Sequence, residues 1–156
     1  MISAVIDTNI IVSGTISSSD PPYEVVEAWR DRQFTLITSP LILKEVERVF
    51  KYPKIMKSYN LYSKTIKAIK LRLSKHSVVT KGKLKVNEIK DDPADNMFLA
   101  CAKEGSADFI VTGDNHLLKL GFFEGIPIAS SRHFLQILKE RTKLKLNQPP
   151  LHPPKR

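Results

Sequence analysis

Short apolar segments alternate with longer amphipathic ones along most of the chain. The apolar segments are rich in β-branched and aliphatic residues and are bounded by polar ones, which is typical of strands buried in a parallel sheet. They lie at 4–6, 34–38, 77–80, 108–112 and 126–129. Because segments with helical spacing separate them, the pattern predicts an α/β fold with a parallel sheet of about five strands and helices on both faces.

Helices are predicted where apolar residues recur at three- and four-residue spacing. Ser39 and Asp92 each stand directly before a proline, and this pairing of an N-cap with a first helical position marks two helix starts. The segment 13–22 is rich in Ser, Gly and Pro, and its composition predicts a loop. The predicted helices cover about 23–32, 40–50, 61–75, 92–104 and 131–141.

The chain of 156 residues is long enough for one domain with a sizeable core, and we expect this domain to occupy residues 1–142. The remaining segment, 143–156, is basic and proline-rich, which predicts an extended or disordered tail. No apolar run approaches the ~20 residues of a membrane span, and the first one is too short for a signal peptide. We therefore expect a cytoplasmic protein without a membrane partner. The single cysteine, Cys101, excludes an intramolecular disulfide.

The net charge of +9 favours a polyanionic partner such as a nucleic acid. Part of this charge lies in the C-terminal tail, so solubility and an acidic protein partner are alternative explanations. The predicted helix 61–75 has a basic face that includes Lys64, Lys67 and Lys70. This face is either solvated, as is usual for an amphipathic helix, or in contact with an RNA backbone.

An acid stands at the end of two predicted strands: Asp7 comes directly after the first, and Asp114 follows the fourth with only Gly113 between them. A third acid, Glu45, lies in the helix that follows the second strand. Because strand ends and the starts of the following helices share one rim of a parallel sheet, these three are expected to lie near one another. Asp95 starts the helix before its strand, so it belongs to the opposite rim unless the connection 81–90 carries it across. For Asp7, the alternative role is a helix cap.

Carboxylates gathered in one cleft repel each other, by about 4 kcal/mol for a pair ~4 Å apart at an effective dielectric of ~20. Such a cluster needs a cation or raised pKa values. Oxygen ligands suit Mg²⁺ or Mn²⁺ rather than Zn²⁺, and a hydroxide bound to such a metal is the natural nucleophile for a phosphodiester. Hydrogen bonds that support the acids are expected from Thr8, Asn9, Thr112 and Asn115.

Other chemistries fit the sequence less well. There is no phosphate-binding glycine motif, and no serine lies in a nucleophile elbow. An aspartyl-phosphate enzyme would use Asp7 as its nucleophile, but the usual companion acid two positions later is Asn9 here. The spacing of a zinc site is absent from the four histidines, which are His76, His116, His133 and His152.

Four segments resemble, in order and in spacing, the four motifs of PIN-domain nucleases. They are Val-Ile-Asp-Thr-Asn at 5–9, the segment from Ser-Pro to Glu at 39–45, Asp-Pro-Ala-Asp-Asn at 92–96 and Val-Thr-Gly-Asp at 111–114. The resemblance extends to about residue 140 and is greatest to the VapC-like ribonucleases of toxin–antitoxin pairs. Each motif alone is weakly specific, whereas the four in register are specific.

This resemblance implies a three-layer α/β/α fold with strand order 3-2-1-4-5, in which the strands that end in Asp7 and Asp114 are neighbours. It also brings the start of the third-motif helix to the same cleft. The implied catalytic and metal-binding residues are Asp7, Glu45, Asp95 and Asp114, with Mg²⁺ or Mn²⁺ as the cofactor. Of the residues that flank the third motif, Asp92 is interpreted mainly as a cap and Asn96 as an accessory residue.

The resemblance further implies a metal-dependent endoribonuclease that cleaves single-stranded RNA. Members of this branch are often homodimers, and an antitoxin covers the cleft with its tail. Two alternatives are a housekeeping nuclease of RNA processing and an RNA-binding PIN module without catalysis. All four acids are present, which favours an enzyme over the binding module.

Overall fold

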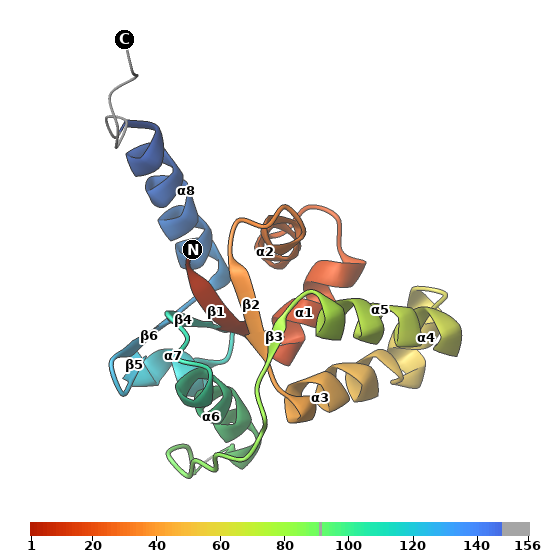
Figure 1. Cartoon of the computed structure of the whole chain (residues 1–156). Coiled ribbons are helices and arrows are strands. Elements are labelled where there is room, and N and C mark those ends of the chain that lie inside the picture. Colours follow the sequence, from red (N-terminus) through yellow and green to blue (C-terminus); the bar gives the residue numbers. More distant parts are fainter. Residues whose placement is uncertain (91, 148–156) are drawn as a thin grey trace.

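The architecture is that of a computed structural model, and the residues it describes are 1–90 and 92–147. These residues form one sheet in the order β3-β2-β1-β4-β6-β5, and its neighbouring strands are parallel except for the last pair (Figure 1). The strands are β1 (Ser3–Ile6), β2 (Thr35–Thr38), β3 (Val78–Val79), β4 (Phe109–Val111), β5 (Phe122–Phe123) and β6 (Ile126–Ala129). The predicted order of the parallel strands is therefore confirmed, and β5 is an added antiparallel edge strand.

Eight helices and one 3₁₀ turn lie in the described part of the chain. They are α1 (Thr8–Ile16), α2 (Pro21–Arg30), α3 (Pro40–Phe50), α4 (Pro53–Ser58), α5 (Ser63–Lys75), η1 (Pro93–Asp95), α6 (Asn96–Glu104), α7 (Asn115–Leu120) and α8 (Ser131–Asn147). Leu36 of β2 lines a small gap together with residues of α1 and α2. The next residue, Ile37, lies against Gly105 at the end of α6. Because successive strand residues point to opposite faces, helices cover both faces of the sheet, as predicted.

The central strand, β1, is held on all sides. It pairs with β2 on one edge and with β4 on the other, and Ala4 and Val5 are completely buried. The ring of Phe134 in α8 packs edge-on against that of Phe34, with centroids 5.0 Å apart, and this contact fastens α8 beside the sheet. Burial of Val5, Phe34 or Phe134 contributes about 1.5–3 kcal/mol for each side chain. The strand is therefore firmly packed, and its end at Asp7 is a fixed position.

Helix α1 is not among the predicted helices, and its last residues, 13–16, lie in the expected loop. The Asp7 carboxylate caps it by accepting a hydrogen bond from the N–H of Ile10. A Cβ atom at Gly14 would lie 2.3 Å from the carbonyl oxygen of Pro22. The glycine therefore permits the close approach of α1 and α2, and it does not mark a turn.

Helix α8 is longer than predicted, since it continues to Asn147. Residues 143–147 are therefore helical, which corrects the expected boundary at 142 and the expected extended tail in that part. Good helix formers and cations occupy the last turns, and cations near a helix C-terminus interact favourably with its dipole. The rest of the predicted tail, 148–156, lies outside the described residues. Across 1–90 and 92–147, none of the helices is both long and apolar enough to cross a membrane.

Candidate metal centre

Asp7 and Asp114 lie at the carboxyl ends of β1 and β4, which are adjacent strands. Asp7 is only 4% exposed. One of its carboxylate oxygens accepts a hydrogen bond from the N–H of Ile10 at 2.9 Å. The other accepts hydrogen bonds from the hydroxyl of Thr112 and from the N–H of Gly113. Asp7 is therefore a helix cap and also a buried acid at the rim of the sheet.

Thr112 connects the two acids. Its side chain is completely buried, and its hydroxyl donates to Asp7 while it accepts a hydrogen bond from the N–H of Asp114 at 3.0 Å. Asp114 in turn accepts a hydrogen bond from the N–H of His116 at 2.7 Å and so caps α7. Hydrogen bonds within the protein therefore fix the positions of both carboxylates.

The substitution Thr112→Val is expected to lower the free energy of unfolding by about 1–3 kcal/mol. Valine has nearly the same shape as threonine, but it removes one of the three donors to Asp7 and leaves the N–H of Asp114 without its acceptor. Urea unfolding measures this loss, and Thr112→Ser is the control because it keeps the hydroxyl. Equal stability of the valine variant and the wild type would contradict the role of this hydroxyl.

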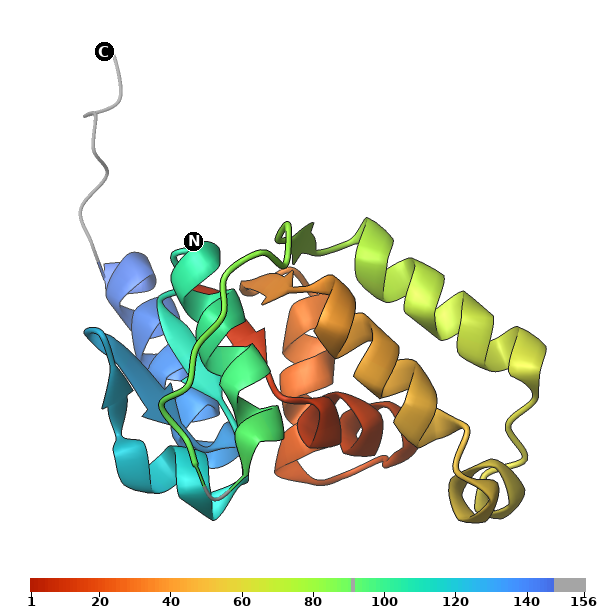
Figure 2. The same ribbon diagram turned by 90° about the horizontal axis from the view of Figure 1, so that it is seen from below.

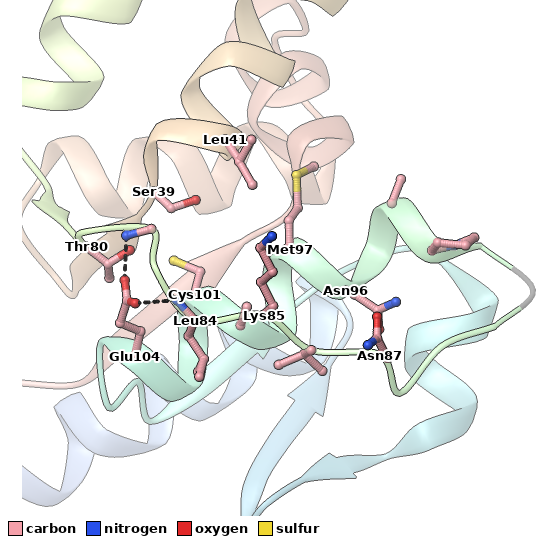
Figure 3. Close-up of a pocket in the computed structure, with 15 residues that line it drawn as sticks. Ser39, Leu41, Thr80, Leu84, Lys85, Asn87, Asn96, Met97, Cys101 and Glu104 are labelled. Atoms are coloured by element: carbon pink, nitrogen blue, oxygen red, sulfur yellow. Dashed lines mark hydrogen bonds between the residues drawn. The ribbon is translucent and has the colours of Figure 1, made fainter.

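Asp95 reaches the same rim because the connection between β3 and α6 runs back along α6. At the end of α6, the carboxylate of Glu104 accepts hydrogen bonds from the backbone N–H groups of residues 82–84 at 2.6–3.0 Å. At its start, the Asn96 side chain accepts from the N–H of Ile89 at 2.8 Å and donates to the carbonyl of Ile89 at 2.9 Å. Figure 3 shows Glu104 and Asn96 at opposite ends of this segment. The connection thus carries Asp95 across, which the sequence pattern alone left open.

A cavity of about 360 Å³ lies between this connection, α6 and the start of α3 (Figure 3). Its lining is mostly apolar, and it includes Cys101. Burial raises the pKa of the Cys101 thiol to about 12, so this cysteine behaves as a small hydrophobic residue and not as a nucleophile. Asp7, Asp95 and Asp114 do not line the cavity, which separates it from the acidic rim.

The substitution Asn96→Ala is expected to lower the free energy of unfolding by about 1–3 kcal/mol, because both backbone groups of Ile89 lose their partner. Hydrogen exchange should increase first in residues 81–90, since these are held by only a few hydrogen bonds. The matched control is Asn87→Ala, which removes an exposed asparagine from the same connection. Wild-type protection of 81–90 in Asn96→Ala would show that Asn96 does not hold the connection.

Four side chains at the rim each offer one ligand atom, and these atoms lie within 4.8 Å of one another. The four are Asp92, Asp95, Asp114 and His116. Asp95 is buried, and its Oδ2 atom has no hydrogen-bond partner among the described residues. Burial, followed by the charges of Asp114 and Asp92, raises the pKa of Asp95 to about 7. Burial also raises the pKa of Asp7. Crowded carboxylates with raised pKa values are typical of a site that binds a cation.

The donor set fits a divalent cation. An unpartnered buried carboxylate oxygen is costly unless a proton or a ligand satisfies it, and the Asp95 Oδ2 atom is in this position. Three carboxylates are the oxygen ligands that Mg²⁺ and Mn²⁺ prefer, and one imidazole is compatible with Mn²⁺.

Two members of the group differ from their predicted roles. The Asp92 side chain makes no capping hydrogen bond, so its interpretation as mainly a cap is wrong and its carboxylate belongs to the rim group. The sequence interpretation also missed His116, because it judged the histidines only by zinc spacing. Its position two residues after Asp114 was the available signal.

The other predicted residues lie around the group. Glu45 is outside it, and its carboxylate accepts a 2.9 Å hydrogen bond from Arg48, which lowers the pKa of Glu45. The hydroxyl of Thr8 is buried without a partner among the described residues. Asn9 and Asn115 are exposed.

Comparisons with known proteins agree with this architecture. A family model described as a PIN domain matches residues 3–116, which is more than two thirds of the chain. An uncharacterized protein of Methanocaldococcus jannaschii is 32% identical over 119 residues, which cover 76% of this chain and 75% of that protein. Among solved structures, VapBC2 from Rickettsia felis, bound to a DNA fragment of its promoter, is similar with a TM-score of 0.54. The similarity covers 83% of this chain and 98% of that one at 14% identity, so it shows the fold alone.

Proposed function

The chain belongs to the PIN-domain family, and from this premise we propose that it is a divalent-metal-dependent endoribonuclease that cleaves single-stranded RNA. The observation that carries the proposal is Asp95, which is buried, has an unpartnered carboxylate oxygen and is crowded by Asp92 and Asp114. A structural acid would instead be paired or exposed. The basic charge of the chain supports a polyanionic substrate.

We propose that four acids hold the catalytic cation, namely Asp7, Glu45, Asp95 and Asp114. A bound Mg²⁺ or Mn²⁺ would lower the pKa of a water and stabilise the charge that develops on the scissile phosphate. Thr112 keeps Asp7 and Asp114 in place through the two hydrogen bonds of its hydroxyl. Arg48 favours the ionised form of Glu45, since it lowers the pKa of that carboxyl.

The accessory residues have separate proposed roles. Asp92 and His116 extend the set of ligands around Asp95. Asn96 fixes the start of α6 through its two hydrogen bonds to the connection before it. Three accessory candidates remain. Thr8 is buried next to Asp7 in the chain, whereas Asn9 and Asn115 are exposed near the acids and accessible to a substrate.

We further propose that the protein is the toxin of a toxin–antitoxin pair that acts in the cytoplasm as a homodimer, with an antitoxin whose acidic segment covers the rim. The similarity in fold to VapBC2, a complex captured on promoter DNA, supports such a partner. The net charge of +9 supports an acidic one. A small adjacent gene for an acidic-tailed DNA-binding protein would favour this proposal, and its absence would count against it in favour of a housekeeping nuclease.

Digestion of total RNA tests the activity. Purified protein is incubated with RNA in Mg²⁺, in Mn²⁺ and in a chelator, and the cut ends are mapped. The proposal requires cuts in single-stranded regions that depend on the metal and disappear in Asp7→Asn. The matched control is Asp31→Asn, which removes the same charge from an exposed position at the end of α2. RNA binding without metal-dependent cleavage would favour a non-catalytic PIN module instead.

A further inference from the structure

The positive charge of this protein is concentrated in one part of the chain. Residues 48–87 contain no aspartate or glutamate. Within them, residues 51–75 form a segment that we call the α4–α5 arm. It consists of the two residues before α4, both helices and the turn between them. The arm carries eight lysine and arginine residues. In Figure 1 it lies at the right-hand end of the molecule, beyond α3.

Exposed tyrosines occur in the same arm. Three of the four tyrosines of the chain lie there, and Tyr52, Tyr59 and Tyr62 are 41%, 50% and 71% exposed. Between the last two, Leu61 packs against the core, and Asn60 has a left-handed backbone with φ of 51°. The turn is therefore anchored by Leu61, while the rings of Tyr59 and Tyr62 face solvent on a fixed backbone.

Only some cations of the arm are neutralised by acids. Glu47 of α3 binds Lys51 at 3.0 Å and Lys70 at 2.8 Å, and these contacts lower the pKa of Glu47 to about 2. This pairing fastens the arm to α3, so Lys70 is engaged within the protein and is a poorer candidate for RNA contact than Lys64 and Lys67. Five exposed lysines of the arm take part in none of the ion pairs found in residues 1–90 and 92–147, and they are Lys54, Lys57, Lys64, Lys67 and Lys75.

The α4 end of the arm lies on the same side of the molecule as the acidic rim, whereas α5 lies in the upper right of Figure 2. Figure 2 shows α4 in the lower part of the view together with the starts of α1 and α6, where Asp7 and Asp95 are found. Helix α3 connects the two regions. Its Arg48 donates to Glu45 and also places its guanidinium over the ring of Tyr52, 5.1 Å from the centroid. A chain that crosses the rim can therefore continue over α3 to the arm.

We propose that the α4–α5 arm binds the single-stranded RNA that flanks the scissile phosphate, with bases stacked on Tyr59 and Tyr62 and phosphates bound by the five exposed lysines. This inference rests on the proposed function and names the surface that selects its substrate. Exposed aromatic rings beside lysines are the means by which proteins hold unpaired bases, whereas a duplex conceals the faces of its bases. An acidic protein would need the lysines but would gain less from the tyrosine rings.

Binding in the presence of a chelator tests the arm without cleavage. The probe is a fluorescent uridine oligonucleotide of about 12 nucleotides, measured by anisotropy over a range of salt concentrations. The double variant Tyr59→Ala/Tyr62→Ala should weaken binding about tenfold or more, whereas Tyr59→Phe/Tyr62→Phe should bind as the wild type does. Lys64→Gln/Lys67→Gln should reduce the salt slope by about 0.7 for each lysine. A duplex of the same length should be insensitive to the tyrosine variants.

The controls carry equivalent changes elsewhere. Phe122→Ala removes an exposed aromatic ring from β5, and Lys139→Gln/Lys143→Gln removes two exposed charges from α8. Unchanged binding by both arm variants, or equal losses in the controls, would overturn the proposal. So would loss of binding only in the lysine variant together with displacement of RNA by polyglutamate, which indicates an acidic protein partner.

Cleavage assays separate this proposal from the proposed function. If the arm variants lose RNA binding but the wild type cleaves no RNA in any metal, the arm is correct and the nuclease is not. If the wild type cleaves RNA and the tyrosine variants bind and cleave as the wild type does, the nuclease is correct and the arm is not.

Discussion

The substitution Asp7→Asn is expected to reduce metal-dependent RNA cleavage by about a hundred- to a thousandfold or more, which is comparable to the loss of a principal electrostatic contact in an active site. The amide removes the negative charge at the point where β1 and β4 end side by side. It keeps an oxygen that can cap α1 through the N–H of Ile10. The fold should therefore persist while the cation is held less tightly.

The effect of Asp7→Asn on stability should be small. Burial raises the pKa of Asp7, so replacing the carboxylate with a neutral amide removes a desolvation cost. Against this, the amide nitrogen would face the N–H of Gly113, which is a donor itself. Thermal unfolding by circular dichroism compares the variant with the wild type and with Asp31→Asn. A folded Asp7→Asn protein with full cleavage activity would disprove the mechanism.

The second large effect concerns Asp95 and pH. Without metal, the wild type is expected to lose stability as the pH rises from about 5.5 to 8, and Asp95→Asn is expected to lose much less. The pKa of Asp95 is about 7 in the folded protein against an ordinary value of 3.8, so the folded state binds the proton more tightly than the unfolded state. By linkage, stability therefore decreases as the pH rises from 3.8 through about 7, and the range from about 5.5 to 8 covers the upper part of this decrease.

The size of the pH effect is bounded by this pKa difference. A shift of three units corresponds to about 4 kcal/mol, and screening by water at the rim should reduce it to about 1–2 kcal/mol. The acids with lowered pKa values, such as Glu47 and Glu104, titrate below this pH range and do not mask the effect. Urea unfolding at several pH values measures it, and the difference between wild type and Asp95→Asn removes the contributions that the two proteins share.

Divalent metal should stabilise the wild type at high pH far more than it stabilises Asp95→Asn. At pH 8, Mg²⁺ or Mn²⁺ at about 100 times its dissociation constant is expected to stabilise the wild type by about 2.7 kcal/mol. Asp95→Asn should respond much less, because it lacks the buried oxygen that has no hydrogen-bond partner in the part of the chain that the structure describes. Asp31→Asn should respond as the wild type does. If Asp95→Asn were stabilised by metal as strongly as the wild type, Asp95 would not be a ligand.

The sheet could be predicted because its strands are short apolar runs with polar ends. Parallel strands buried on both faces need such runs, and the order of segments then fixes which residues follow each strand. Asp7 and Asp114 were found in this way, and they lie at the ends of adjacent strands. Helix α1 was not predicted, because a helix that is buried on several sides has no polar stripe and Gly14 resembled a loop residue.

The position of Asp95 depended on information that local patterns do not contain. Its helix precedes its strand, so topology alone left its rim undecided, and only the resemblance to a family assigned it to the rim of Asp7 and Asp114. The structure shows the physical cause, which is a connection held along α6 by Glu104 and Asn96. His116 joins the rim group because Asp114 caps α7 by accepting a hydrogen bond from the N–H of His116, which keeps these two residues together.

The sequence by itself therefore determined the α/β class and the acids that follow β1 and β4. Together with the family resemblance, it also determined the order of the parallel strands. Only the tertiary structure decided which other side chains meet those acids, and that Lys70 is bound to Glu47 while neighbouring lysines are not. The physical reason is that secondary structure follows from local periodicity, whereas the meeting of Asp92 and Asp95 with Asp114 depends on contacts between residues far apart in the chain.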